Sequence, residues 1–426
     1  MITRLILAAT LALAACAASP QPPQNTARTN PATAADFLEL NFRMESGREI
    51  PHFTRFEGPI RVAMTGPIPP SAAPDLAKVL ARLRSEAGLD IRSAPLPPAH
   101  VGSEFLPRAT MRATVPDAAC FVVPNAKSWA EFRAQRGTAS LDWTQLKTRS
   151  HSTIFIPTDV APQEIRDCLH EELAQSLGPL NDLYHLSDSV FNDDNFHTQL
   201  TKTDMLFLRM AYAPELRSGM TQAEVAAILP ALLQRLNPKG GTGPTQSPRQ
   251  TPRSFAVSIE GALTGANTLE ARRASAKSAL AQAHRNGWHD NRLAFAHFLT
   301  ARLSDKQNPK VALAHYDQAA AIYGSLPTGA LHLAHVDLQR ANIALTNRDL
   351  AQVLALTARA KPAALAHEST PLLAILAMLR SESLTALGQA AEARAARLDS
   401  LAWGRYAFGS EDKALARLTE VSSPKR

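Results

Sequence analysis

The sequence is poor in cysteine, in charge and in the motifs of the common enzyme classes. Of its 426 residues only three are cysteines, 6% are aromatic and 19% are charged, with a net charge of +7. The basic residues are scattered rather than gathered in a block or interleaved with aromatics, which argues against nucleic-acid binding. It has no G-x-S-x-G elbow, phosphate-binding glycine loop or C-x-x-C motif. Composition therefore gives no support to serine-hydrolase, nucleotide-binding or thioredoxin-like chemistry.

Long hydrophobic runs are also missing, apart from one short stretch at the N-terminus. Arg4 precedes an apolar segment at residues 5–13, and about 12 apolar residues are too few to cross roughly 30 Å of hydrocarbon. The segment Leu-Ala-Ala-Cys that ends at Cys16 resembles the signal of bacterial lipoproteins. That resemblance implies a signal peptide at residues 1–15 and acylation of Cys16. Because Ala17 rather than Asp follows, it also implies an anchor in the outer membrane, facing the periplasm.

If Cys16 carries lipid, Cys120 and Cys168 are the remaining thiols. Two thiols in an oxidising envelope readily form a disulfide, and this one would close a loop of about 48 residues. The alternative is two separately buried thiols. Neither cysteine has the surroundings of a known thiol hydrolase, so a nucleophilic role is disfavoured.

Composition divides the rest of the chain into four parts. Residues 16–35 are rich in Pro, Ala, Thr and Asn and are expected to form a flexible tether. Short apolar runs at 60–64, 89–92, 121–123 and 153–156 predict strands, which alternate with helical segments to give an α+β domain over residues 36–236. Residues 237–253 are rich in Gly, Pro, Thr and Ser and predict a linker.

Residues 254–426 change to an alanine-, leucine- and arginine-rich composition that predicts an all-α domain. Leu303, Leu345 and Leu387 lie 42 residues apart, and each precedes a turn and a further helix. The pattern resembles tetratricopeptide-type helix pairs, which stack and typically bind a protein or peptide partner. An irregular helical bundle without a true repeat is the alternative.

The segment from Pro162 to His197 contains most of the polar residues that could carry chemistry. Pro162 suits the first turn of a helix, and Gly178-Pro179 predicts its end through a left-handed glycine cap. One face of this helix is apolar. The other face carries Cys168, Glu171, Gln175 and Gly178.

The spacing from Glu171 to Asp182 resembles the metzincin zinc proteases, whose frame is H-E-x-x-H-x-x-G-x-x-H-D. The resemblance places Glu172 at the general-base position and Gly178 at the turn glycine. The three zinc-ligand positions are occupied by Glu171, Gln175 and Asn181, which lack imidazoles. The unshifted frame that begins at His170 fails because Ala174 replaces its second histidine.

A broader resemblance covers roughly residues 35–236. The run CLHEELAQSLGPLNDLYHLSDSVFNDDNFH and the later PELRSGM are similar to a bacterial family known as domain-of-unknown-function family 2927. The fold class expected is therefore a metzincin-like α+β domain followed by a helical-repeat domain. The family implies no activity and no cofactor.

The nature of any metal site stays open at this level. A carboxylate and two amides suit zinc poorly, but oxygen ligands suit a harder ion such as calcium. Additional oxygen donors and a second set of histidines are near in sequence: Asp182, Asp193, Asp194 and Asn195; His170, His185 and His197. The simpler interpretation is a hydrogen-bonded helix face with capped turns, because Asp and Asn often bond their own backbone.

Two functions follow from these patterns. The first is a non-catalytic, membrane-tethered adaptor that binds peptide or protein. The second is a hydrolase acting on envelope peptide or peptidoglycan, with Glu172 as general base. The missing imidazoles favour the adaptor, because they are the usual way to hold a metal that acidifies a bound water.

Overall fold

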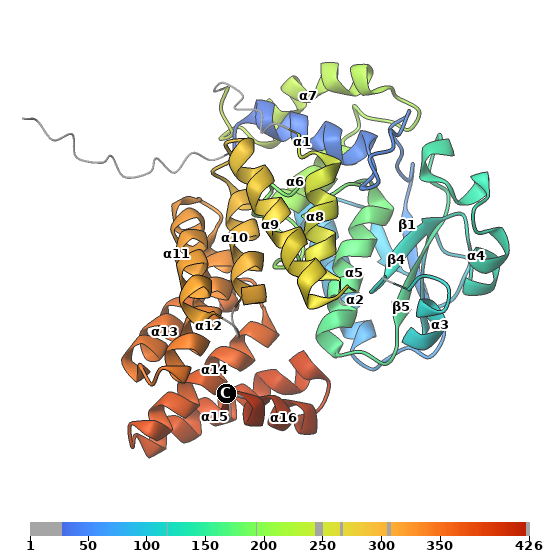
Figure 1. The fold of residues 1–426 in the computed structure, drawn as a ribbon. Helices are drawn as coiled ribbons and strands as arrows, with labels where there is room; N and C mark the ends of the chain where they lie inside the picture. Colours follow the sequence, from blue (N-terminus) through green and yellow to red (C-terminus); the bar gives the residue numbers. More distant parts are fainter. Residues whose placement is uncertain are drawn as a thin grey trace, which may run out of the picture.

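The computed structural model of the chain describes residues 28–116, 118–192, 194–242, 250–264, 267–304 and 308–422. These residues form an N-terminal α/β domain and a C-terminal region of helices that packs against it (Figure 1). The predicted order, a mixed α and β domain followed by an all-helical region, is confirmed. The signal peptide and Cys16 lie outside the described residues.

A five-stranded mixed sheet forms the centre of the N-terminal domain. Its strands are β1 (Ile60–Thr65), β2 (Ile91–Ser93), β3 (Val101–Leu106), β4 (Phe121–Pro124) and β5 (Ser152–Pro157). The order in the sheet is β2-β1-β3-β5-β4, and only β4 runs antiparallel to its neighbour. Strand β5 is buried along its whole length, as expected for a strand with neighbours on both sides. Strand β4 is the last in this order, so it has a neighbour on one side only and is an edge strand.

Helices cover the sheet. Those of this domain are α1 (Asn30–Phe42), α2 (Ala72–Glu86), α3 (Arg108–Arg112), α4 (Trp129–Gln135), α5 (Pro162–Leu177), α6 (Lys202–Ala211) and α7 (Gln222–Leu236), with short 3-10 turns at Ala139–Leu141 and Trp143–Gln145. Helices α2 and α5 pack against each other and share the main core with the sheet, whereas a separate aromatic cluster around Trp129 and Phe132 joins α4 to Phe155 of β5. Helix α1 begins inside the segment expected to be a tether, because the Thr29 side chain caps it and Pro31 occupies its first turn.

Helix α5 has the predicted bounds, but its end differs in conformation from the prediction. It begins at Pro162 and ends at Leu177, immediately before Gly178. The predicted left-handed cap is wrong, since Gly178 has φ of 177° and is extended. A β-carbon on Gly178 would lie 3.3 Å from Oδ1 of Asn41, so this glycine instead allows a close approach to α1.

The C-terminal region consists of successive antiparallel helices. They are α8 (Arg253–Leu263), α9 (Leu269–Arg285), α10 (Asn291–Ser304), α11 (Pro309–Ser325), α12 (Ala330–Thr346), α13 (Leu350–Ala366), α14 (Thr370–Ala386), α15 (Ala390–Phe408) and α16 (Glu411–Ser422). Leu303 and Leu345 lie at the ends of α10 and α12, and Leu387 caps α14. The 42-residue spacing in the sequence therefore marks the first helix of three consecutive pairs.

The first helix of each pair contacts the N-terminal domain. Asn291 of α10 donates to the Tyr184 carbonyl, and His332 of α12 donates to Asp194. Thr370 of α14 donates to the Gln163 side chain on α5. These three helices are buried on almost every side, whereas α9, α11, α13 and α15 keep exposed faces. The inner face of the helical region, formed by α10, α12 and α14, is thus covered by the protein's own N-terminal domain.

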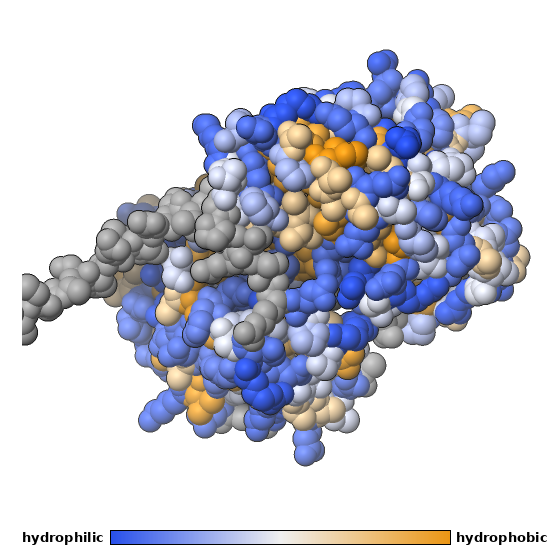
Figure 2. Space-filling model, turned by 90° about the horizontal axis from the view of Figure 1, so that it is seen from above, coloured by the Kyte–Doolittle hydropathy of each residue, from blue (hydrophilic) through white to orange (hydrophobic). Residues whose placement is uncertain are grey.

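The face formed by α7 and α1 carries apolar side chains among polar ones (Figure 2). The exposed positions of α7 include Ala223, Ala227, Pro230 and Ala231, and the helix has no charge between Glu224 and Arg235. Across the described part of the chain, no helix combines the length and hydrophobicity that a membrane span requires.

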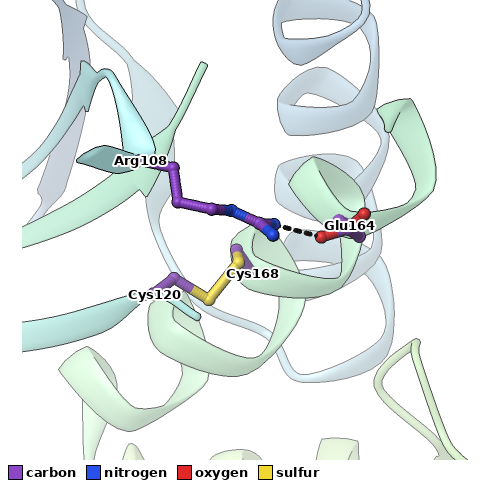
Figure 3. Close-up of a disulfide and its surroundings, with 4 residues drawn as sticks. All are labelled: Arg108, Cys120, Glu164 and Cys168. Atoms are coloured by element: carbon purple, nitrogen blue, oxygen red, sulfur yellow. Dashed lines mark hydrogen bonds and ion pairs between the residues drawn. A yellow bond between two sulfur atoms is a disulfide. The ribbon is translucent and has the colours of Figure 1, made fainter. Parts of the chain in front are cut away.

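A disulfide joins Cys120, just before β4, to Cys168 of α5 (Figure 3). The predicted pairing is confirmed. Beside it, the guanidinium of Arg108 lies 2.5 Å from a carboxylate oxygen of Glu164, one turn earlier on α5 (Figure 3). Helix α5 is therefore held covalently to the residue before edge strand β4, and by an ion pair to the start of α3.

Candidate functional site

Glu172 points from α5 toward the edge strand β4 and is buried, with 6% of its surface exposed. Its carboxyl accepts a hydrogen bond from the backbone N–H of Val122 in β4. No hydrogen-bond partner for its Oε2 lies among the described residues. Burial, and then the negative charges of Glu171 and Glu45, raise the pKa of Glu172 well above its ordinary value. The neutral form of the carboxyl is therefore favoured.

The residues at the zinc-ligand positions are used in contacts with the segment around the end of α1. The side chain of Gln175, which is 9% exposed, hydrogen-bonds to Glu45. Asn181 donates to the backbone carbonyl of Glu39 at 3.2 Å. Glu171 is half-buried beside Glu172. Gln175 and Asn181 therefore hold α1 and the following loop against α5.

These residues do not fit a zinc ion. The donor set is one carboxylate and two amides, whereas zinc prefers imidazole and thiolate. Within the described ranges, no three His, Cys, Asp or Glu side chains are placed to hold a metal ion together. No reaction step through a metal can be derived from this arrangement.

Arg149, a buried arginine with no motif around it to single it out, lies at the end of α5. Arg149 donates to the carbonyls of Gln175 and Ser176 at 2.6 and 2.7 Å, and also to that of Gly178. Its guanidinium lies 4.7 Å from the ring centre of Trp143. Burial lowers the pKa of Arg149 to about 10, so it remains a cation at neutral pH. A positive charge here complements the negative end of the helix dipole and satisfies carbonyls that a helix end leaves free.

Next to this helix end is a polar hollow at the seam between the two domains. The side chains of Glu45 and Asp182 are hydrogen-bonded to each other there. Glu45 is exposed as a residue, yet enough protein surrounds its carboxyl that desolvation raises its pKa. The hollow is also lined by charged residues of both domains: Glu39, Arg43, Arg253 and Glu260. Carboxyls and guanidiniums are mixed in it, so it has no uniform charge for a ligand of one sign.

Asp194 lies at the centre of the interface between the domains. It is fully buried, and its Oδ2 accepts from His332 Nε2 at 2.8 Å and from Asn291 Nδ2 at 3.0 Å. The neighbouring Phe196 packs its ring against Phe298 and His335 of the helical region. Burial alone would raise the pKa of Asp194, but His332 and Asn291 outweigh it and the pKa is lowered. The loop that was a candidate ligand cluster is thus a docking element.

The histidines of the candidate set do not come together. His170 accepts from the Leu200 N–H at 3.2 Å, and burial lowers its pKa to about 3. His197 bonds to the Ser187 carbonyl at 3.1 Å, and burial lowers its pKa to about 4. His185 contacts Asp36 at 2.8 Å. Each has a separate structural partner.

Two members of the candidate acidic loop remain. Asn195 is exposed, with the positive φ of 59° that Asn tolerates in a turn. Asp193 lies outside the described residues. The bond between Asp194 and Asn192, at 2.9 Å, shows the local side-chain bonding typical of such turns.

Residues 30–231 match the family described as "Protein of unknown function (DUF2927)". The N-terminal domain belongs to this family, as the resemblance in the sequence indicated. A search of the curated proteins and a search of the solved structures each found no match.

Proposed function

We propose that the chain is a lipid-anchored binding protein of the bacterial envelope. Its N-terminal domain has a zincin-like scaffold without hydrolytic activity, and its helical region binds a protein partner. The observation that carries this proposal is the placement of Glu172. The one general-base position that the metzincin frame retains is buried against the edge strand, where burial favours the neutral carboxyl.

Support for the zincin-like scaffold comes from the order of elements and from the frame on α5. Strand β1, the long helix α2 and strand β2 follow one another, which is the order that the resemblance implies at the start of the domain. Glu172, Gln175 and Asn181 are all buried and all lie near the segment at the end of α1. The shared surroundings favour a common origin for the frame over a chance spacing.

The alternative is a hydrolase with Glu172 as general base. A buried carboxyl with a raised pKa and an unpartnered oxygen is a feature that active sites also show. A general base must, however, be ionised before it can take a proton from water. Burial disfavours the ionised form of Glu172, and Gln175 and Asn181 bond to the segment around the end of α1, so the adaptor is better supported.

The start of the described chain, at Arg28, is compatible with an anchor at Cys16. Asn30 bonds to the carbonyls of Gly240 and Gly241, so the chain enters α1 beside the end of α7. Eleven residues lie between Cys16 and Arg28, so a fully extended chain spans at most about 43 Å from one to the other. An anchored molecule would therefore hold the uncharged face of α7 near the bilayer.

Hydrolysis assays on purified protein test the proposal. Casein and purified peptidoglycan would be offered to the wild type, to Glu172→Gln and to Glu270→Gln, an exposed control on α9. The expected result is no turnover by any of the three. Turnover by the wild type and the control that Glu172→Gln loses would overturn the proposal in favour of the hydrolase.

A further inference from the structure

The inner face of the helical region is covered by the N-terminal domain, so an external partner needs another surface. Helices α13 and α15 are neighbours in the outer layer and leave a groove between them, with α14 as its floor. We propose that this groove binds a segment of a partner protein that inserts a large apolar side chain between an acidic and a basic residue. This inference rests on the proposed binding function and names the site and the chemistry of the ligand.

The groove has an apolar floor and an aromatic wall. Leu373 and Leu376 of α14 form the floor and are each 3% exposed, while Trp403 of α15 is 37% exposed. The hollow has a volume of about 230 Å³, which suits one or two large side chains. A half-exposed tryptophan beside buried leucines is the composition found where most binding energy is concentrated in protein interfaces.

Charge separates the two sides of the groove. Lys361 of α13 and Arg380 of α14 are basic, whereas Glu392 and Asp399 of α15 are acidic. Across the groove, Lys361 and Asp399 approach only to 4.0 Å, and both are more than half exposed. A partner segment with an acidic residue toward α13 and a basic residue toward α15 would complement both sides. Such complementarity contributes to specificity as well as to affinity.

A second groove in the same outer layer shows that these features are particular to this one. It lies between α9 and α11 over α10, and Lys277 of α9 stands where Lys361 stands on α13, 84 residues later. Among the described residues that line it, Arg273 and Lys277 are the charged ones and none is aromatic. The repeated architecture therefore supplies the groove, and the sequence of α14 and α15 supplies the tryptophan and the opposed charges.

Selection from a phage-displayed library of random 12-residue peptides tests the proposal on the full chain without its signal. Selected peptides would be titrated by calorimetry into the wild type, Trp403→Ala, Arg380→Glu and the control Leu398→Ala. Leu398 lies on α15, is 69% exposed and is not part of the groove. Circular dichroism would establish that each variant is folded.

The proposal expects peptides with a large apolar residue flanked by opposite charges. Their affinity should fall at least about tenfold for Trp403→Ala and stay within about twofold for Leu398→Ala. Changing the acidic residue of the peptide to lysine should restore binding to Arg380→Glu. A library that enriches nothing, or peptides that bind Trp403→Ala as well as the wild type, would overturn the groove, whereas only turnover in the hydrolysis assays would overturn the non-catalytic function.

Discussion

Asp194 accepts a hydrogen bond of 2.8 Å from Nε2 of His332, although 138 residues separate them in the chain. Both side chains have no exposed surface. The pair joins the loop after α5 to helix α12, and Asn291 of α10 bonds to the same carboxylate oxygen. A buried, multiply bonded carboxylate at a domain interface fixes one relative position of the two domains, because losing it leaves several buried polar groups without partners.

Replacing Asp194 with alanine should destabilise the protein strongly. The substitution leaves His332 and Asn291 without their shared acceptor, and breaking a buried pair in this way costs roughly 3–5 kcal/mol. Denaturant unfolding followed by fluorescence would measure the loss. Asp399→Ala removes an exposed acid of the helical region and should change the free energy of unfolding by less than about 0.5 kcal/mol. If Asp194→Ala lowered the free energy of unfolding no more than Asp399→Ala does, the buried pair at the interface would not contribute to stability.

The buried histidines of the interface should make stability fall with acid. Burial lowers the pKa of His197 from 6.5 to about 4, and that of His335 from 6.5 to about 3. A histidine whose pKa is lowered in the folded state binds more protons when the chain is unfolded. Its contribution to folding stability is therefore complete above about pH 6.5 and is lost as the pH falls toward 4. For His197 the loss is roughly 3 kcal/mol. Asp194, whose pKa is also lowered, acts in the same direction.

Other buried groups oppose this trend, so the test needs a difference measurement. Burial raises the pKa of Asp204 to about 6 and of Asp167 to about 7, and these groups favour the folded state as the pH falls. His197→Asn should flatten the decline between pH 6.5 and 4 relative to the wild type. His289→Asn, at an exposed histidine, should leave the decline unchanged. Parallel curves for the wild type and His197→Asn would contradict the assignment.

Removing the disulfide should also lower stability. Cys120 and Cys168 close a loop of 48 residues, which is worth roughly 2–4 kcal/mol through the entropy of the unfolded chain. The double substitution to serine should therefore lower the thermal midpoint. A reductant should lower the wild-type midpoint to a similar value and leave the variant unaffected. A reductant effect on the variant would point to some other thiol chemistry.

Cys16 should carry lipid. Radiolabelled palmitate given to expressing cells should label the wild type and Cys120→Ser, and should not label Cys16→Ser. The unlabelled variant should leave the membrane fraction, because the apolar stretch that ends before Cys16 is too short to span a bilayer. Labelling of Cys16→Ser would refute the lipoprotein signal.

Local signals in the sequence predicted the elements that local chemistry determines. Pro162 and Gly178 bracket α5, and the apolar runs at 121–123 and 153–156 became β4 and β5. Strand β3 was missed because Gly102 and Glu104 interrupt its apolar pattern. Gly102 is required by packing, since a β-carbon there would lie 3.1 Å from Oγ1 of Thr153 on β5.

The partners of the candidate site residues could not be predicted in this way. The sequence singled out Glu172, Gln175 and Asp194 as candidate site residues, but it could not supply their partners. Glu45 lies 127 residues before Glu172, and His332 lies 138 residues after Asp194. Contacts between residues far apart in the chain leave no periodic pattern in the sequence. For this reason the loop around Asp194 was predicted as a candidate ligand cluster, whereas it packs against the helical region.

The protonation state of Glu172 is the sharpest test of a non-catalytic N-terminal domain. Infrared difference spectroscopy of the wild type against Glu172→Gln at pH 7 would isolate the signal of this carboxyl. The account predicts the carbonyl band of a protonated acid, present in the wild type, absent in the variant and unchanged when the pH is lowered to 5. Carboxylate bands at pH 7 that convert to an acid with an ordinary glutamate pKa would contradict it, and would return Glu172 to candidacy as a general base.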